Sequence, residues 1–430
     1  MDLKIIQSGN QVTVAFTVEL TGSMMDMEND IQKALNAVGC GLTSQALYSF
    51  DTQGQPLTMG DVKFTVQQKA LKVYETPYGS VPIARHVYQT SKGGKTYCPL
   101  DDNARIITNS TPRFAQIVSS KYVNGCAAGV QDDLLLSHGR QVARSYVQNL
   151  AETVGTLAHA VEETLNYEIP PLEAKVATVG LSLDGTCMYL QKEGYREAMT
   201  GTLSLYDTAG DRLHTIYLGA APEYGKETFL QNLEHEIGKV KKKFPNATYV
   251  GIADGASSNW KFLEAHTTIN ILDFYHATEY LGEASEAFAK DPGERKAWLT
   301  EACHRLAHHV EGAQILLQEM KERRRILPVH AKATQRIQEK LDKAVTYFTN
   351  QLPRMHYKTY QDQKLPIGSG VTEAACKTLI KQRLCHSGMK WKTKGAQIVI
   401  SLRAIAKTSG RWPQFWDRIN KQGLAGVLLA

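Results

Sequence analysis

Three carboxylates stand where two metal ions could use them. Asp184 lies within the apolar segment 179–185, Asp254 ends the apolar segment 249–254, and Glu373 opens a helical segment just after Gly368-Ser-Gly370. A buried, unpaired carboxylate in a strand is costly, so these aspartates need a compensating cation. Mg²⁺ prefers carboxylate oxygens, and a pair of such ions supports phosphodiester chemistry. The pattern therefore predicts a site for two Mg²⁺ ions, with Mn²⁺ as a substitute.

A plainer interpretation exists for each aspartate alone. Asp184 and Asp254 both precede glycine, and Asp-Gly is a common turn sequence. The interpretation as a metal site depends on Glu373, whose place in the first turn of a helix favours an ionised acid. Gly368 and Gly370 would let a nucleic-acid backbone approach closely.

The composition is that of a folded chain of several domains. With 430 residues, 43% of them hydrophobic, the chain is expected to form two to four units. It has no apolar run of about 18 residues and no signal-peptide order at its start, so we expect a cytoplasmic, nucleoid-associated protein without a membrane span. The seven cysteines show no C-x-x-C pair, and no phosphate-binding loop of the ATP type occurs, so neither a zinc ribbon nor ATP is expected.

Positive charge is concentrated after Glu373. From Ala374 to Ala430 eleven Lys or Arg face a single acidic residue, Asp417, although the whole chain carries a net charge of only +6. Such a basic segment beside a candidate metal site suits a phosphate backbone, although a solvated helix surface is the alternative. The expected DNA contacts here are Lys377, Lys381, Arg383, Lys390, Lys392 and Lys394.

The first part of the chain changes its periodicity near residue 106. Alternating apolar residues predict strands near 12–18 and within 61–90, with a helix over 24–38 between them. Residues 111–164 then have helical periodicity, with a turn at 137–140 that suggests a helix-turn-helix. Its candidate outward-facing DNA contacts are Arg140, Arg144, Gln148 and Asn149.

From residue 176 the pattern becomes that of a ribonuclease-H-like sheet. Three strands are expected first, then a helix and two further strands. In that arrangement the first and fourth strands are neighbours, which would bring Asp184 and Asp254 to the same ions. Residues 277–350 are helical by pattern and separate Asp254 from Glu373 as an insertion. The expected segments are strands 176–183, 199–205, 213–218, 248–253 and 270–273 and a helix over 226–244.

Four blocks resemble a known family. Leu183-Asp-Gly185, Ala253-Asp-Gly-Ala256, Asp273-Phe-Tyr-His276 and Gly368-Ser-Gly-Val-Thr-Glu-Ala-Ala-Cys-Lys377 occur in the order found in bacterial insertion-sequence DDE transposases. They resemble the branch related to Mutator-type elements, which carries an Asp-x-x-His or Cys-x-x-His signature after the second aspartate. Ser387-Gly-Met-Lys-Trp391 is similar to that branch as well. The resemblance covers about residues 176–400.

The resemblance implies roles for the site residues. It makes Asp184, Asp254 and Glu373 the metal ligands, and it places Asp273 and His276 near the active site, where His276 would hold the scissile phosphate or orient its neighbours. The helical insertion would contact DNA, and Trp298 within it could stack on an unpaired base. A Trp on an amphipathic helix is also a common core residue, and His276 could be a structural histidine.

The expected protein is thus an α+β, multidomain transposase that acts on double-stranded DNA as a homodimer or larger synaptic assembly. It would bind terminal inverted repeats and catalyse strand cleavage and strand transfer. A catalytically silent DNA-binding repressor and a structure-selective nuclease on the same core are the alternatives. The expected domains are an N-terminal α/β module 1–105, a helical DNA-binding unit 106–170, a ribonuclease-H-like core in two parts, 171–278 and 363–400, a helical insertion 279–362 and a basic helical tail 401–430.

Overall fold

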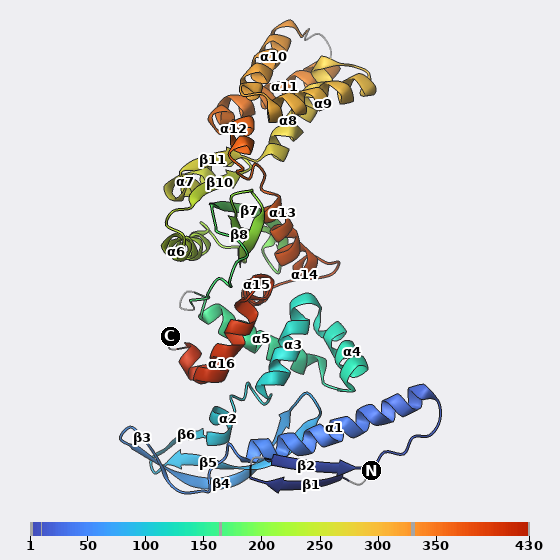
Figure 1. Cartoon of the computed structure of the whole chain (residues 1–430), viewed down its shortest axis with the longest axis vertical. Coiled ribbons are helices and arrows are strands. Elements are labelled where there is room, and N and C mark those ends of the chain that lie inside the picture. Colours follow the sequence, from blue (N-terminus) through green and yellow to red (C-terminus); the bar gives the residue numbers. More distant parts are fainter. Residues whose placement is uncertain (1–2, 10, 163–165, 328–331, 429–430) are drawn as a thin grey trace. The chain divides into compact units, whose positions relative to one another are not determined.

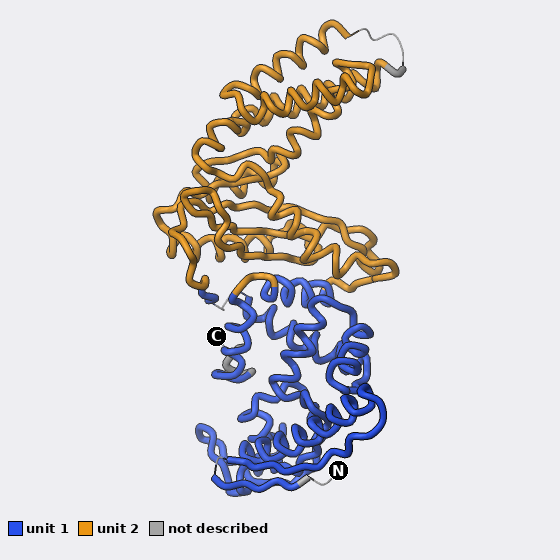
Figure 2. Tube along the Cα trace, turned by 45° about the vertical axis from the view of Figure 1, so that its right-hand side comes forward, with its two compact units in different colours: residues 1–168, 394–406, 410–430 blue, residues 169–393, 407–409 orange. Residues whose placement is uncertain are grey.

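The computed structural model describes residues 3–9, 11–162, 166–327 and 332–428, which have a mixed α+β fold. The chain divides into two compact units, coloured separately in Figure 2. One contains Met1–Glu168, Lys394–Ala406 and Gly410–Ala430, and the other contains Ile169–Thr393 and Lys407–Ser409. No helix in the described part of the chain is long and apolar enough to cross a membrane.

Two antiparallel sheets open the first unit (Figure 1). A hairpin pairs β1 with β2, and a second sheet has the order β3-β4-β5-β6. The turn between β4 and β5 forms because the Thr76 N–H donates to the Gly79 carbonyl at 3.0 Å. Within the range 61–90, where the sequence predicted strands, β4 is a single long strand with a β-bulge between Val66 and Gln68. The bounds are β1 Leu3–Ser8, β2 Gln11–Phe16, β3 Leu57–Met59, β4 Val62–Glu75, β5 Ser80–Thr90 and β6 Gly93–Tyr97.

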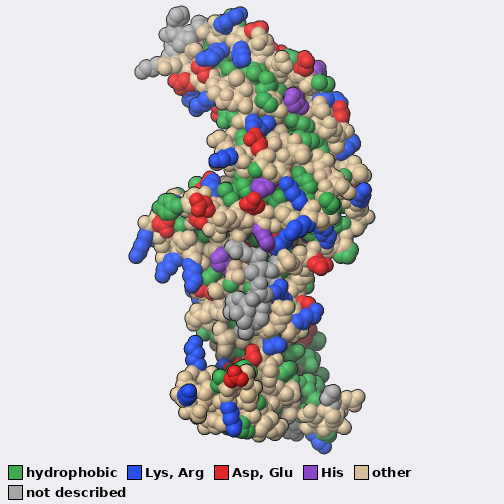
Figure 3. All heavy atoms as spheres, turned by 90° about the vertical axis from the view of Figure 1, so that its left-hand side faces the viewer, with side chains coloured by type: hydrophobic (Ala, Val, Ile, Leu, Met, Phe, Trp, Pro, Cys, Tyr) green, Lys and Arg blue, Asp and Glu red, His purple; other side chains and the backbone are tan. Residues whose placement is uncertain are grey.

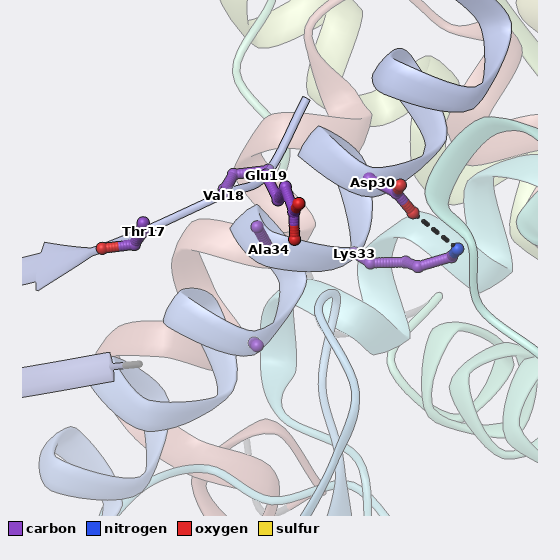
Figure 4. A pocket seen from close by; sticks show the side chains of 7 residues that line it. Thr17, Val18, Glu19, Asp30, Lys33 and Ala34 are labelled. Carbon is purple, nitrogen blue, oxygen red and sulfur yellow. Dashed lines mark hydrogen bonds and ion pairs between the residues drawn. The ribbon is translucent and has the colours of Figure 1, made fainter. Parts of the chain in front are cut away.

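Helix α1 (Met24–Tyr48) begins where the sequence predicted and continues beyond residue 38. A capping box fixes its start, because Ser23 Oγ accepts from the Asp26 N–H and Asp26 Oδ2 accepts from the Ser23 N–H. A hollow of about 550 Å³ lies between α1 and the segment after β2, with the Asp30–Lys33 ion pair at 2.9 Å among its lining (Figure 4). None of the predicted site residues lines this hollow.

The remaining helices of the first unit come from both ends of the sequence. Helices α5 and α15 approach closely, because a Cβ built at Gly155 would lie only 2.4 Å from Ile398 Cγ2. Of the tail expected over 401–430, residues 401–406 and 410–428 belong to this unit, whereas Lys407–Ser409 are grouped with the other. The bounds are α2 Pro99–Asn103, α3 Pro112–Asn124, α4 Ala127–His138, α5 Arg144–Ala160, α15 Thr393–Lys407 and α16 Arg411–Leu428.

The second unit is built on a five-stranded sheet of order β11-β10-β7-β8-β9. Strands β7, β8 and β9 are antiparallel neighbours, whereas β10 is parallel to both β7 and β11. The prediction that the first and fourth strands lie side by side is confirmed. The bounds are β7 Thr178–Leu190, β8 Gly194–Tyr206, β9 Arg212–Ala220, β10 Thr248–Ala253 and β11 Ile269–Leu272.

Helices cover both faces of this sheet. Successive residues of a strand point to opposite faces, and Gly201 and Thr202 of β8 show which helix lies on each. A Cβ at Gly201 would lie 3.1 Å from Phe229 of α6 (Glu227–Lys243), whereas Thr202 Oγ1 is 2.6 Å from Thr372 Oγ1 of α13 (Gly370–Ala375). Helix α7 (Ser257–His266) follows β10.

The segment between β11 and α13, which the sequence pattern predicted as an insertion, is helical. Its buried side chains join the same hydrophobic core as the sheet, including Leu316 of α10 and Phe348 of α11. The bounds are α8 Phe274–Phe288, α9 Pro292–His308, α10 Gly312–Ile326, α11 Lys332–Gln351 and α12 Tyr357–Asp362, with a 3-10 turn at Leu352–Arg354.

Candidate active site

Asp184 lies within β7, and Asp254 directly follows the last residue of the neighbouring parallel strand β10. The last paired residues of β7 and β10 are Ser182 and Ile252, and each aspartate lies two residues further along the chain. Residues two apart on a strand point to the same face. Ser182 pairs with Thr202, so Asp184 points to the face of the sheet that α13 covers. The register therefore directs Asp184 toward the helix that carries Glu373, and the pairing of β7 with β10 brings Asp254 close enough to interact with Asp184.

The Asp184 carboxylate is half-buried and held by two donors. Its Oδ1 accepts from the Gly185 N–H at 2.7 Å, and its Oδ2 lies 3.5 Å from Cys376 Sγ. Burial raises the pKa of Asp184, and the negative charge of Asp254 adds to that rise, whereas the two donors oppose it. A cation placed between Asp184 and Asp254 would relieve both causes of the raised pKa.

The loop after β10 is fixed by helix α11. Tyr347 donates its hydroxyl hydrogen to the Asp254 carbonyl at 2.5 Å, and Gln351 Nε2 donates to the Gly255 carbonyl at 3.2 Å. Gly255 has φ +106°, a conformation that favours glycine, and a Cβ there would lie 3.0 Å from the Tyr347 ring. The Asp254 side chain itself accepts from the Ala256 N–H at 3.1 Å. The inserted helices therefore hold one of the candidate ligands in place.

Glu373 lies in the first turn of α13, next to His276. His276 Nε2 is 3.9 Å from Glu373 Oε1, and its Nδ1 is 3.2 Å from Glu279 Oε2. The His276 side chain is 35% exposed and that of Glu373 47% exposed, so a ligand can reach both. The sequence blocks that contain Asp273-x-x-His276 and Glu373 thus meet at one place in the fold.

Asp273 is completely buried and joins two segments of the site. It caps α8 by accepting from the His276 N–H at 3.0 Å, and its other oxygen accepts from the Ser369 N–H. Although the sequence pattern grouped it with the catalytic residues, these contacts give it a positioning role. Asp273 fixes His276 relative to the Gly368-Ser369-Gly370 loop that precedes Glu373.

No model of a known protein family matches this chain, and a search of curated proteins finds no match.

The four proposed site residues form two separate contacts rather than one cluster. Asp184 interacts with Asp254, and Glu373 lies beside His276. Across the described ranges, no three His, Cys, Asp or Glu side chains form a group that could hold a metal ion. The donor set nevertheless fits Mg²⁺ chemically, since three carboxylates supply only hard oxygen ligands.

Two of the predicted DNA contacts are buried structural residues. Arg140 is 6% exposed, lies 2.5 Å from Glu75 and donates to the Thr76 carbonyl at 3.0 Å. Arg383 is 2% exposed, with its guanidinium 5.3 Å from the centre of the Trp391 ring. The prediction that Arg140 faces outward is therefore wrong, because it neutralises a carboxylate in the interior of the first unit.

The other predicted contacts face solvent, apart from Trp298. Trp298 is half-buried and stacks on Phe288 with ring centres 4.1 Å apart, as a core residue does. The exposed side chains are those of Arg144, Gln148, Asn149, Lys377, Lys381, Lys390, Lys392 and Lys394.

The basic segment after Glu373 is divided between the two units, and some of its arginines are buried. Lys377 to Lys392 belong to the second unit, and most of the later cations belong to the first. Arg403 and Arg411 are buried in that unit. On the face drawn in Figure 3, Lys and Arg side chains appear in several groups with Asp and Glu among them. The candidate DNA contacts near Glu373 are therefore the exposed lysines of the second unit alone.

Sequence reasoning missed three residues that hold the site. Cys376 follows Glu373 by three residues, so helical spacing alone places both on one face of the helix. Tyr347 and Gln351 are four apart on α11, but nothing in the sequence connects them with Asp254. A π-helical segment at Cys376–Lys381 was also missed, and such segments are frequent at functional sites.

Proposed function

We propose that this protein is a DNA transposase of the DDE type, with a ribonuclease-H-like catalytic core formed by β7–β11, α6, α7 and α13. The observation that carries the proposal is that Asp184, on β7, faces the helix of Glu373 and interacts with Asp254, which follows the neighbouring parallel strand β10. The sheet order, with three antiparallel strands followed by two parallel ones, supports the same core.

Asp184, Asp254 and Glu373 would hold two Mg²⁺ ions. When bound, the ions supply activation of the attacking oxygen and stabilisation of the leaving oxygen of a phosphodiester. His276, next to Glu373, would contact the scissile phosphate as a hydrogen-bond donor. A Cβ at Gly370 would meet no atom within 4 Å, so packing does not require this glycine and the loop leaves room for a DNA backbone.

Binding to the terminal inverted repeats would use the helices of the first unit, with Arg144, Gln148 and Asn149 on the exposed side of α5. Cleavage frees a 3′-hydroxyl, which then attacks a phosphodiester of target DNA and displaces the oxygen on the other side of that phosphorus. Two ends must be joined, so we expect a homodimer or a larger assembly.

The test uses a plasmid that carries the two ends of the element, incubated with the full-length protein in Mg²⁺ or in EDTA. We expect nicked and joined products in Mg²⁺ only. Asp184→Asn, Asp254→Asn and Glu373→Gln should each reduce both products by at least about 100-fold, because one misplaced or missing group can cost that much. Glu283→Gln changes an exposed carboxylate of α8 outside the site and serves as the matched control.

The products distinguish the alternatives. Metal-dependent nicking without joining would favour a structure-selective nuclease. End binding without nicking in the wild type would favour the silent DNA-binding protein. Full activity in Asp184→Asn would refute the assignment of the site.

A further inference from the structure

A second hollow, of about 400 Å³, lies at the far end of β7 within the second unit. Cys187 and Tyr189 of β7, Tyr195 of β8 and the loop 384–390 line it. Its volume lies within the range of small-molecule sites, which is about 300–1,000 Å³. None of the proposed catalytic residues is among its lining residues, so it is a separate feature of the fold.

The wall formed by the loop is held rigidly. Trp391 Nε1 donates to the Leu384 carbonyl at 3.0 Å and closes the loop on itself. The Gln191 N–H donates to the Trp391 carbonyl at 2.8 Å, and Leu190 forms a parallel bridge with Trp391. Backbone pairing with β7 therefore anchors the loop at Trp391, and the Trp391 side chain ties that end to Leu384.

The chemistry of the lining favours a flat aromatic ligand with an anionic group. Tyr195 is 77% exposed and Tyr189 is 37% exposed, and their rings meet edge to face with centres 5.4 Å apart. Lys390 contributes the positive charge, and no acidic residue occurs among the described lining residues. Exposed aromatic rings beside a cation are the features that hold unpaired bases in single-stranded nucleic acids.

The hollow lies on the same strand as the proposed active site. Cys187 follows Asp184 by three residues, about 10 Å along the strand. Because successive residues alternate between faces, Cys187 and Tyr189 point to the face of the sheet opposite that of Asp184. Pairing of β10 with β7 ends at Ser182, so the loop 384–391 approaches an edge of β7 that β10 has left.

We propose that this hollow binds one unpaired nucleobase of the DNA on which the protein acts, with the base stacked on Tyr195 and its phosphate beside Lys390. The inference rests on the proposed function, since it names a second contact for the same DNA. A base that leaves the duplex loses the stacking energy with its neighbours, and stacking on the tyrosine ring restores part of that energy.

The test is a binding measurement with full-length protein in EDTA, where no cleavage occurs. One probe is a duplex with a single unpaired 2-aminopurine, and the other is the same duplex with that base paired. We expect the wild type to bind the first probe more tightly, with a fall in fluorescence as the base stacks. Tyr195→Ala should weaken binding of the unpaired probe by about 5- to 100-fold. Tyr195→Phe should bind like the wild type because it keeps the ring.

Two further variants separate the hollow from general DNA binding. Tyr224→Ala removes a tyrosine of similar exposure, 81%, that lies outside the hollow, and it should leave the preference unchanged. Lys390→Gln should weaken the binding of both probes. It should also reduce the slope of log K against log salt concentration by about the amount expected for one phosphate contact. The proposal is overturned if the wild type shows no preference, as it would if a protein segment fills the hollow, or if Tyr195→Ala keeps the preference.

These outcomes are independent of the catalytic test. Loss of the preference in Tyr195→Ala together with metal-dependent nicking supports both proposals. An unchanged preference together with nicking overturns the base site and leaves the transposase proposal standing. A base preference without any nicking supports the base site and counts against the proposed chemistry.

Discussion

Cys376 donates a hydrogen bond to Asp184, with its Sγ 3.5 Å from Oδ2. Burial raises the pKa of Cys376 to about 12, and the nearby charge of Asp184 adds to the effect. The thiol therefore stays protonated at neutral pH and acts as a donor rather than as a nucleophile. Because Cys376 follows Glu373 by one helical turn, the helix that carries one proposed metal ligand also orients another.

The first prediction concerns this contact. Cys376→Ser keeps a donor next to Asp184 and should nick end-bearing DNA at close to the wild-type rate. Cys376→Ala removes the donor and should slow nicking by about 3- to 10-fold, because a hydrogen bond of this kind is worth around 1 kcal/mol. Initial rates in saturating Mg²⁺ measure the effect. Equal rates for Ala and Ser would show that the thiol does not orient Asp184.

The second prediction uses the raised pKa of Asp184. The pKa of Asp184 in the native state lies above the unfolded value of 3.8, so the native state binds the proton more tightly than the unfolded state does. As pH rises and the carboxyl ionises, the free energy of unfolding therefore falls. In EDTA, Asp184→Asn should therefore melt a few degrees above the wild type at pH 7–8, since the amide never ionises. The difference should disappear below about pH 3.8, where the carboxyl is protonated in both states. A melting temperature that is lower than the wild type at pH 8 would contradict the burial argument.

Much of the second unit could be predicted from its sequence. Long apolar runs such as 248–253 mark buried strands, and the parallel pairing of β7 and β10 follows from an α/β crossover. The positions of Asp184 and Asp254 follow from that pairing. The sequence also predicted that helices separate these aspartates from Glu373, because the apolar residues of 277–350 recur with helical periodicity.

The contacts that hold the site were less predictable because they join residues distant in sequence. Nothing local distinguishes Tyr347, which bonds the Asp254 carbonyl 93 residues away. Arg140 looked like a surface residue because arginine usually is one. Its partner Glu75 is 65 residues earlier, so only the tertiary fold shows that the pair is buried. The same reason explains why the C-terminal arginines looked like one basic surface.

The third prediction separates Arg140 from Arg144. Arg140→Gln leaves Glu75 without its cation in a nearly buried position, so the first unit should lose about 3–5 kcal/mol of stability. Arg144→Gln changes an exposed residue at the start of α5 and should leave the melting temperature within about one degree of the wild type. Chemical denaturation followed by circular dichroism measures both.

The same pair should behave in the opposite way toward DNA. At a temperature where both variants are folded, Arg144→Gln should weaken binding to end-bearing DNA and reduce the salt dependence by about one phosphate contact. Arg140→Gln should bind with the wild-type affinity. Weaker binding by folded Arg140→Gln, with Arg144→Gln unaffected, would restore the sequence-based assignment of Arg140.

The fourth prediction tests the positioning role of Asp273. Asn in its place can accept only one of the two backbone N–H bonds, from His276 and Ser369, so one buried donor loses its partner. Asp273→Asn should therefore lower stability by about 1–3 kcal/mol. It should also slow nicking, because His276 and the loop before Glu373 would no longer be fixed to each other. A positioning role predicts that rising Mg²⁺ does not restore the rate, whereas a metal ligand predicts partial recovery. Recovery of nicking at high Mg²⁺ would therefore assign Asp273 to the metal site itself.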